Sequence, residues 1–139
     1  MLELIVDANI LFSALLAKSA TRALIFNSQL KLYSPEYLLS ELDEHLKSDN
    51  ELKEKLKQTN EETNAVIHEL IHNINIFPIS EYAIFVKRAI EICPDEYDAP
   101  YFALALKLKC QLWSNDKRLK KQQIIGVLNT SELISLLNQ

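Results

Sequence analysis

The 139-residue sequence contains a single glycine, Gly126. Phosphate-cradling loops of P-loop and dinucleotide-binding proteins need several glycines, because these let backbone N–H groups approach a phosphate closely. Both kinds of loop are therefore excluded. Positive charge is also scarce, since 15 Lys and Arg against 19 Asp and Glu give a formal net charge of −4. A general nucleic-acid coat is usually basic, so any polyanion binding must be local or bridged by metal.

Cysteines and long apolar runs are scarce as well. Cys93 and Cys110 are the only cysteines and do not form a C-x-x-C pair. One disulfide is conceivable, but reduced, buried thiols fit a chain without an export signal better. Apolar runs such as Leu2 to Val6 are far too short to cross a bilayer, and Met1 leads directly into a strand-like segment. We expect a cytoplasmic protein without a membrane-spanning segment.

The residues that are present indicate an α/β protein. Hydrophobic residues make up 48% of the chain, and its length fits one domain over residues 1–139. Short apolar strands alternate with helical patterns, which indicates a parallel sheet covered on both faces. We predict a three-layer α/β/α sandwich around a mainly parallel sheet of four to five strands. The strand candidates are 2–6, 30–33, 76–79, 111–113 and 125–128, and the helical patterns are 10–27, 35–47, 59–75, 80–93, 98–109 and 132–137, with a surface helix or hairpin within 49–60.

Three helix starts carry recognisable capping signals. Ser34 is predicted as an N-cap with Pro35 at the first helical position, where its missing N–H does no harm. Thr59-x-x-Glu62 resembles a capping box. Ser131 is predicted to cap the last helix.

Two acids follow predicted strands directly, namely Asp7 and Asp116. In open parallel sheets, ligands bind at the carboxyl ends of the strands, where the strand order reverses. Each acid can alternatively cap the helix that follows it, since Asp is a favoured N-cap.

Two further acids lie on predicted helices. Glu41 borders the apolar stripe of the helix over 35–47, where a carboxylate can reach over the sheet edge, although a solvated acidic face is the usual explanation of such a run. Asp98 comes in or just before the first turn of an apolar helix, because Pro100 is tolerated only near a helix start. Asp95 is either the cap of that helix or an additional acid of the site.

The order of these segments resembles the PIN domain family of metal-dependent ribonucleases, which includes toxins of toxin–antitoxin pairs. The matching segments are Val6-Asp7-Ala8-Asn9-Ile10-Leu11, Leu39-Ser40-Glu41-Leu42, Asp98-Ala99 and Ser114-Asn115-Asp116-Lys117. The resemblance covers essentially the whole chain. It departs from the family pattern in the extra acid Asp95, in Pro100 so early in its helix, and in the acidic overall charge.

The resemblance implies that Asp7, Glu41, Asp98 and Asp116 hold Mg²⁺ or Mn²⁺ for hydrolysis of RNA, single-stranded by expectation. Hard divalent cations prefer carboxylate oxygens and water, and they relieve the repulsion between gathered carboxylates. By the same carry-over, Ser114 helps to order the site and Asn9 supports it, and Asp95 is expected to support it as an additional acid outside the family pattern. An antitoxin protein and a homodimer are the partners that it implies.

A basic run directly follows the last acid. It contains Lys117, Arg118, Lys120 and Lys121. These side chains can contact RNA phosphates beside the metal, which would make affinity depend on salt. A solvated helix face is the alternative interpretation.

His68-Glu69-Leu70-Ile71-His72 matches the zinc metalloprotease motif H-E-x-x-H. A protease would need a third ligand such as Glu91 or Glu96. The apolar face of this helix is predicted on the opposite side from the two histidines, which argues against a cleft. A third class is a catalytically inactive binding or scaffold protein that keeps the fold.

Overall fold

The computed structural model describes residues 1–16, 20–48 and 60–139, and in this part of the chain five strands form one parallel sheet in the order β3-β2-β1-β4-β5. This confirms the predicted fold class. The strands are β1 (Leu2–Val6), β2 (Leu30–Pro35), β3 (Ile74–Phe77), β4 (Gln111–Trp113) and β5 (Val127–Leu128). The order reverses between β1 and β4, so the crevice that parallel sheets offer to ligands lies at their carboxyl ends.

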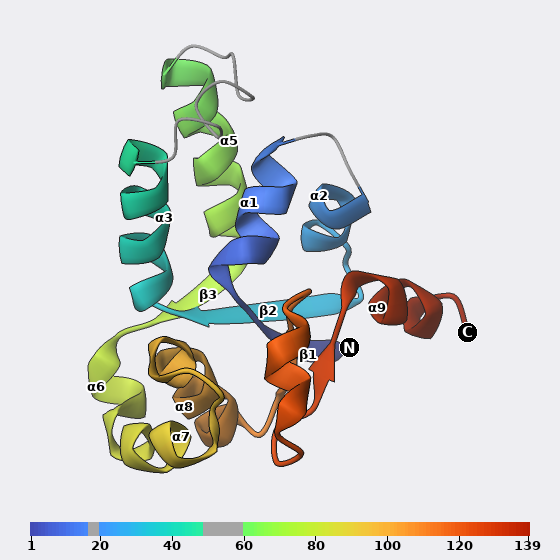
Figure 1. The fold of residues 1–139 in the computed structure, drawn as a ribbon. Helices are drawn as coiled ribbons and strands as arrows, with labels where there is room; N and C mark the ends of the chain where they lie inside the picture. The colour runs from blue at the N-terminus through green and yellow to red at the C-terminus, as the bar shows by residue number, and fades with distance from the viewer. Residues whose placement is uncertain (17–19, 49–59) are drawn as a thin grey trace.

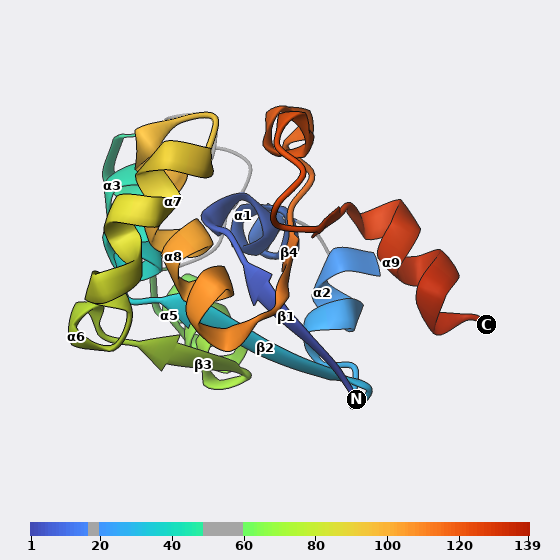
Figure 2. The ribbon, with the colours of Figure 1, turned by 90° about the horizontal axis from the view of Figure 1, so that it is seen from below.

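Helices cover both faces of the sheet (Figure 1). On one face lie α1 (Ala8–Leu16), α2 (Ala20–Ile25), α3 (Tyr37–Ser48) and α5 (Asn60–His72). On the other lie α6 (Ile79–Tyr82), the 3₁₀ turn η1 (Ala83–Phe85), α7 (Val86–Ile92), the 3₁₀ turn η2 (Glu96–Asp98) and α8 (Ala99–Leu108). Helix α8 contacts β1, β2 and β4, and α6 and α7 pack beside it (Figure 2). The 3₁₀ turn η3 (Lys117–Lys121) follows β4, and α9 (Thr130–Leu137) contacts β5.

The predicted helix start at Ser34-Pro35 is wrong, because both residues belong to β2 and α3 begins at Tyr37. Ser34 is fully buried and its hydroxyl donates to the carbonyl of Val6 at 2.9 Å, which ties the end of β2 to β1. Pro35 pairs in register with Phe77 at the last position of the strand, where the missing N–H of a proline is tolerated.

The predicted third strand lies two residues too late. It was expected over 76–79, but α5 ends at His72 and β3 occupies Ile74–Phe77. Its register is fixed by pairing with β2, and the Asn75 side-chain amide donates to the Leu32 carbonyl at 3.0 Å. The helix expected over 80–93 is divided into α6, η1 and α7.

The other boundaries follow the same pattern of small shifts. The helix expected over 10–27 is divided into α1 and α2, and the last strand is confined to β5. Asn129, rather than Ser131, caps α9 through a capping box with Glu132. Helix α8 begins at Ala99 with Pro100 in its first turn, as the sequence predicted. Thr59 and the surface helix predicted within 49–60 fall almost entirely outside the described residues.

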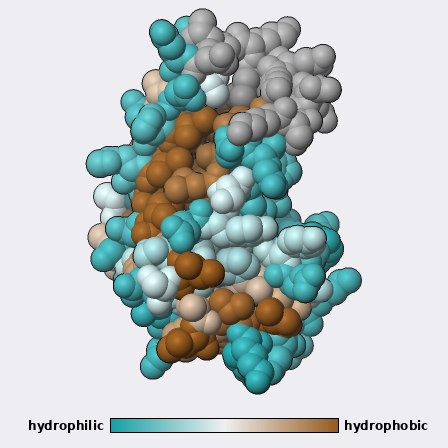
Figure 3. Space-filling model, turned by 90° about the vertical axis from the view of Figure 1, so that its left-hand side faces the viewer, coloured by the Kyte–Doolittle hydropathy of each residue, from teal (hydrophilic) through white to brown (hydrophobic). Residues whose placement is uncertain are grey.

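The core lies between the sheet and its two helix layers. The largest of the fully buried side chains come from the strands and from α1, α3, α5, α6 and α8. They are Trp113, Tyr82, Phe102, Leu4, Ile5, Ile10, Leu11, Leu32, Leu38, Leu70, Leu104 and Leu112. Apolar side chains also reach the surface, and Figure 3 shows them in a band on the face that carries α3 and α6.

Two expectations about composition can be compared with the structure. Cys93 and Cys110 are both free and half-buried. None of the helices in the described part of the chain has the length and apolar character needed to cross a lipid bilayer.

Replacement of a core residue of α8 should separate packing from surface effects. Leu104 has no exposed surface, so Leu104→Ala is expected to lower the free energy of unfolding by about 2 to 5 kcal/mol through lost burial and a residual cavity. Ile84 is 85% exposed, and Ile84→Ala is expected to change the free energy of unfolding by less than about 0.5 kcal/mol. Urea denaturation of both variants measures this, and equal losses would contradict the assigned core.

Candidate metal centre

The acids predicted from strand ends lie on either side of the point where the strand order reverses. Asp7 directly follows β1, and Asp116 follows β4. Asp7 accepts from the backbone N–H of Ile10 at 3.1 Å, and Asp116 accepts from that of Arg118 at 3.0 Å. The capping interpretation therefore holds for both acids. It leaves their second oxygens for other partners, so capping does not exclude a role in a site.

Ser114 connects these two acids. Its buried hydroxyl donates to Asp7 Oδ2. The Ser114 hydroxyl oxygen in turn accepts from the backbone N–H of Asp116 at 3.1 Å. The side chain thus fixes one carboxylate and orders the loop that carries the other.

Asp98 lies at the start of α8, on the helix layer beneath the sheet. Asp98, Asp7 and Ser114 line the same narrow gap, which is too small to admit a water molecule and whose apolar walls include Phe102 and Trp113. The side chain of Asp98 makes no capping hydrogen bond to α8. Asp95, by contrast, caps η2 by accepting from the N–H of Tyr97 at 3.0 Å. Of the two acids in this turn, Asp98 is the one directed to the site.

Glu41 joins the cluster through a residue that the sequence did not single out. The hydroxyl of Tyr101 donates to Glu41 Oε1, although α3 and α8 lie on opposite faces of the sheet. Tyr101 is only 3% exposed and also lines the narrow gap of Asp7 and Asp98. The available signal was a phenolic tip in an otherwise apolar helix, because a buried tyrosine hydroxyl usually needs a polar partner.

The electrostatics fit a set of acids that share a confined space. Burial, followed by repulsion from Asp98 and Glu41, raises the pKa of Asp7 to about 6 despite the hydrogen bonds that it accepts. Burial, followed by Asp95 and Asp116, raises the pKa of Asp98 to about 6. Burial also raises the pKa of Glu41. Charged groups whose pKa values are displaced together in this way are typical of functional sites.

Asp116 differs from the other three acids. Arg118 donates from Nη2 to its Oδ2 at 2.8 Å and from Nε to its Oδ1 at 3.1 Å. These hydrogen bonds hold the pKa of Asp116 below its usual value. The basic run is thus partly engaged within the chain, since Lys120 also pairs with Glu132. Lys117 and Lys121 are exposed, as is Asn9 on the first turn of α1.

The four carboxylates supply the oxygen ligands that Mg²⁺ and Mn²⁺ prefer, so the donor set fits a hard divalent cation. Among the described residues, however, no three acidic, histidine or cysteine side chains are close enough to form a finished set of ligands. Mg²⁺ commonly keeps several waters and uses only one or two carboxylates directly. The arrangement is therefore suited to an ion that is held partly through water.

The rival zinc motif is not assembled into a site. His68, Glu69 and His72 are exposed on α5, whereas Leu70 is buried, as the helical pattern predicted. The suggested third ligands, Glu91 and Glu96, belong to α7 and η2, on the other face of the sheet from α5 (Figure 1). The sheet separates them from the two histidines.

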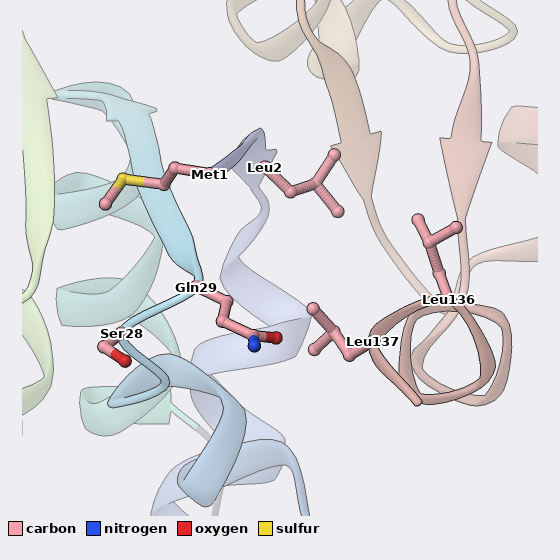
Figure 4. A pocket seen from close by; sticks show the side chains of 6 residues that line it. All are labelled: Met1, Leu2, Ser28, Gln29, Leu136 and Leu137. Carbon is pink, nitrogen blue, oxygen red and sulfur yellow. The ribbon is translucent and has the colours of Figure 1, made fainter. Parts of the chain in front are cut away.

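An open cavity of about 680 Å³ lies away from the acids, next to the amino-terminal end of β1. Its lining is mostly apolar and comprises Met1, Leu2, Ser28, Gln29, Leu136 and Leu137 (Figure 4). No ionisable side chain is among them. It does not offer the chemistry of the acidic cluster.

Comparison with known proteins shows the family and the fold. The family model described as the PIN domain matches residues 5–132. The crystal structure of PAE2754 from Pyrobaculum aerophilum is similar with a TM-score of 0.68 at 18% identity, covering 99% of this chain and 91% of that chain. The crystal structure of VapBC2 from Rickettsia felis bound to a DNA fragment from their promoter is similar with a TM-score of 0.66 at 13% identity, covering 92% of this chain and 98% of that chain. No curated protein sequence matches the chain. At these identities the two structures support the fold alone.

The raised pKa of Asp7 predicts a dependence of stability on pH. Below about pH 4 the carboxyl is protonated in both the folded and the unfolded chain and imposes no penalty. Between about pH 4 and pH 6 the unfolded chain gives up this proton while the folded chain keeps it, so stability falls across that range, and above it the folded chain holds a costly charge. In EDTA at pH 7.5, Asp7→Asn is therefore expected to raise the free energy of unfolding by roughly 1 to 3 kcal/mol.

Urea denaturation between pH 4 and pH 7.5 measures this gain, which should shrink towards zero at pH 4. Asp116→Asn is the matched control, because the pKa of Asp116 is lowered and its charged form is favoured by Arg118. This control should not gain stability at pH 7.5. A gain of equal size in both variants, or none in Asp7→Asn, would contradict the assigned electrostatics.

Proposed function

The chain belongs to the PIN domain family, and from this premise we propose that it is a Mg²⁺- or Mn²⁺-dependent endoribonuclease that hydrolyses phosphodiester bonds of single-stranded RNA. The observation that carries the proposal is the convergence of Asp7, Asp98 and Ser114 on one narrow gap at the reversal of the strand order. Two of these residues are carboxylates with pKa values raised to about 6. Such a site has a strong electrostatic reason to bind a cation.

Asp7, Glu41, Asp98 and Asp116 would hold the ion, with Asp95 and Asn9 nearby in support. When bound, a divalent cation supplies polarisation of the phosphodiester and orientation of an attacking water for in-line displacement. Catalysis of phosphoryl transfer depends mainly on positioning and electrostatics, so the order of the surrounding side chains matters as much as the acids.

The chain's own residues provide that order. Ser114 holds the Asp7 carboxylate in one orientation through its hydroxyl, and Tyr101 does the same for Glu41. Phe102 and Trp113 are buried against the narrow gap and exclude bulk water from its inner side. In a water-poor setting of this kind, charges act on each other more strongly than in solution.

The basic run that follows Asp116 offers phosphate contacts beside the acids. Lys121 and Arg118 line a cleft together with Asp95 and Asp98. Basic side chains next to the carboxylates allow a protein with a net negative charge to bind the phosphates of an RNA backbone at this one place. We infer in addition an antitoxin-type protein partner and a homodimer, both of which follow from the family resemblance, and we propose the cytoplasmic location expected from the sequence.

The central prediction is cleavage of RNA that depends on Mn²⁺ or Mg²⁺. We expect the purified protein to cut unstructured RNA oligonucleotides, and Asp98→Asn to lower kcat by at least about 100-fold because it removes an acid of the centre. Glu91→Gln is the control, since Glu91 is exposed and pairs with Arg88 on α7. Gel analysis of labelled RNA and DNA oligonucleotides measures rate and substrate preference.

Two results together would favour the inactive binding or scaffold protein. One is the absence of any cleavage with either ion, and the other is an Asp116→Asn variant that behaves in cells as the wild type does. Cleavage that persists in Asp7→Asn and Asp98→Asn would show that another site, or a contaminant, is responsible.

Metal binding should also be visible without a substrate. A ligand that binds only the folded chain stabilises it in proportion to its occupancy, so millimolar Mn²⁺ is expected to raise Tm. Asp7→Asn should abolish most of this shift, whereas His72→Ala should leave it intact. Loss of tightly bound zinc in His72→Ala, with no Mn²⁺ effect in the wild type, would instead support the metalloprotease reading.

A further inference from the structure

Arg118 lies directly on Asp116, the acid that follows β4. Its guanidinium meets both carboxylate oxygens, at 3.1 Å from Nε and 2.8 Å from Nη2, and its own backbone N–H donates to Oδ1 at 3.0 Å. A planar fork that engages both oxygens is the favourable geometry for such a pair. The positively charged partner of Asp116 is therefore the guanidinium of Arg118 in the same chain.

The influence of the cluster on Arg118 extends beyond this one partner. Arg118 also lines a cleft together with Asp95 and Asp98. Its positive charge therefore lies beside three carboxylates, two of which are proposed metal ligands. A divalent cation that enters the same cluster must repel this guanidinium and compete with it for the oxygens of Asp116.

The position of Arg118 allows it to move. Its side chain is 63% exposed, whereas that of Asp116 is only 16% exposed, so solvent surrounds the guanidinium while the acid is largely covered. Arg118 also borders a cleft of about 350 Å³ beside the acids. The cleft is lined by Ile92, Pro94, Asp95, Asp98, Arg118, Lys121 and Gln122. A guanidinium released from Asp116 can turn into this cleft next to Lys121 without disturbing the core.

We propose that Arg118 exchanges partners: it pairs with Asp116 before a divalent cation binds, and it is released to bind an RNA phosphate beside Lys121 once the cation is held. This inference rests on the proposed function. Arg118 would then weaken metal binding and strengthen substrate binding. The arrangement of charges that the proposed reaction needs would then be complete only when metal and RNA are both bound.

Metal binding is measured first, without RNA. Isothermal titration of Mn²⁺, or the electron paramagnetic resonance signal of free Mn²⁺, gives the dissociation constant. We expect Arg118→Gln to tighten Mn²⁺ binding by about two- to fivefold, the range that corresponds to loss of one exposed competing ion pair. Arg118→Lys keeps the charge but loses the fork, and should give an intermediate value.

Arg88→Gln is the matched control. Arg88 is an exposed arginine that pairs with Glu91 on α7 at 3.3 Å, so its loss removes the same charge from the chain without touching the four acids. Its Mn²⁺ affinity should equal that of the wild type. Circular dichroism of each variant checks that the fold is retained.

RNA cleavage at saturating Mn²⁺ is the second measurement. Arg118→Gln should lower kcat/KM and reduce the slope of log kcat/KM against log salt by about one phosphate contact. Opposite effects on metal affinity and on substrate use are the signature of an exchanged partner. A residue with a merely structural role would weaken both.

The outcomes separate this inference from the proposed function. If the wild type cuts RNA with Mn²⁺ but Arg118→Gln binds Mn²⁺ no more tightly than Arg88→Gln, the exchange is overturned and the nuclease stands. If Arg118→Gln tightens Mn²⁺ binding without altering the salt slope, release to a phosphate is overturned. If the wild type binds no Mn²⁺ and cuts no RNA, both the exchange and the proposed function fail.

Discussion

The carboxylate of Asp7 is held where a charge is costly, and the arrangement of the surrounding residues follows from that constraint. It lies at the end of a buried central strand and beside two other acids, yet it accepts hydrogen bonds from Ser114 and from the backbone of Ile10. These donors fix its orientation without removing the penalty, since its pKa remains raised to about 6. The fold thus spends stability on a charge that a bound cation would neutralise, as expected where function rather than stability determines the residue.

Each remaining member of the cluster is positioned by a different layer of the molecule. Ser114 belongs to the sheet edge after β4, Glu41 to α3 above the sheet, and Tyr101 and Asp98 to α8 beneath it. The hydrogen bond between Tyr101 and Glu41 connects the two helix layers across this edge. The geometry of the centre consequently depends on how both layers pack on the sheet, and it can be disturbed from either side.

Sequence patterns were sufficient for the parallel sheet, because continuous apolar strands between helices have few other solutions. They also placed Asp7 and Asp116 at strand ends. They failed at Ser34-Pro35, where a good local capping signal lost to tertiary pairing with β1 and β3. They missed the roles of Tyr101 and of Arg118 on Asp116, because both depend on contacts that arise only when distant elements or a specific turn are formed. The spacing of residues in the sequence predicts the helices and strands. The side-chain contacts between different elements can be identified only in the folded structure.

The order β3-β2-β1-β4-β5 has a consequence for synthesis on the ribosome. The acids come from positions 7, 41, 98 and 116, and β4 pairs directly with β1 although more than a hundred residues separate their starts. Such long-range pairing forms late, because the intervening chain must first be made and ordered. A nascent chain that lacks α8 and β4 has Asp7 and Glu41 but no centre. The acidic cluster therefore cannot assemble until most of the molecule has been translated.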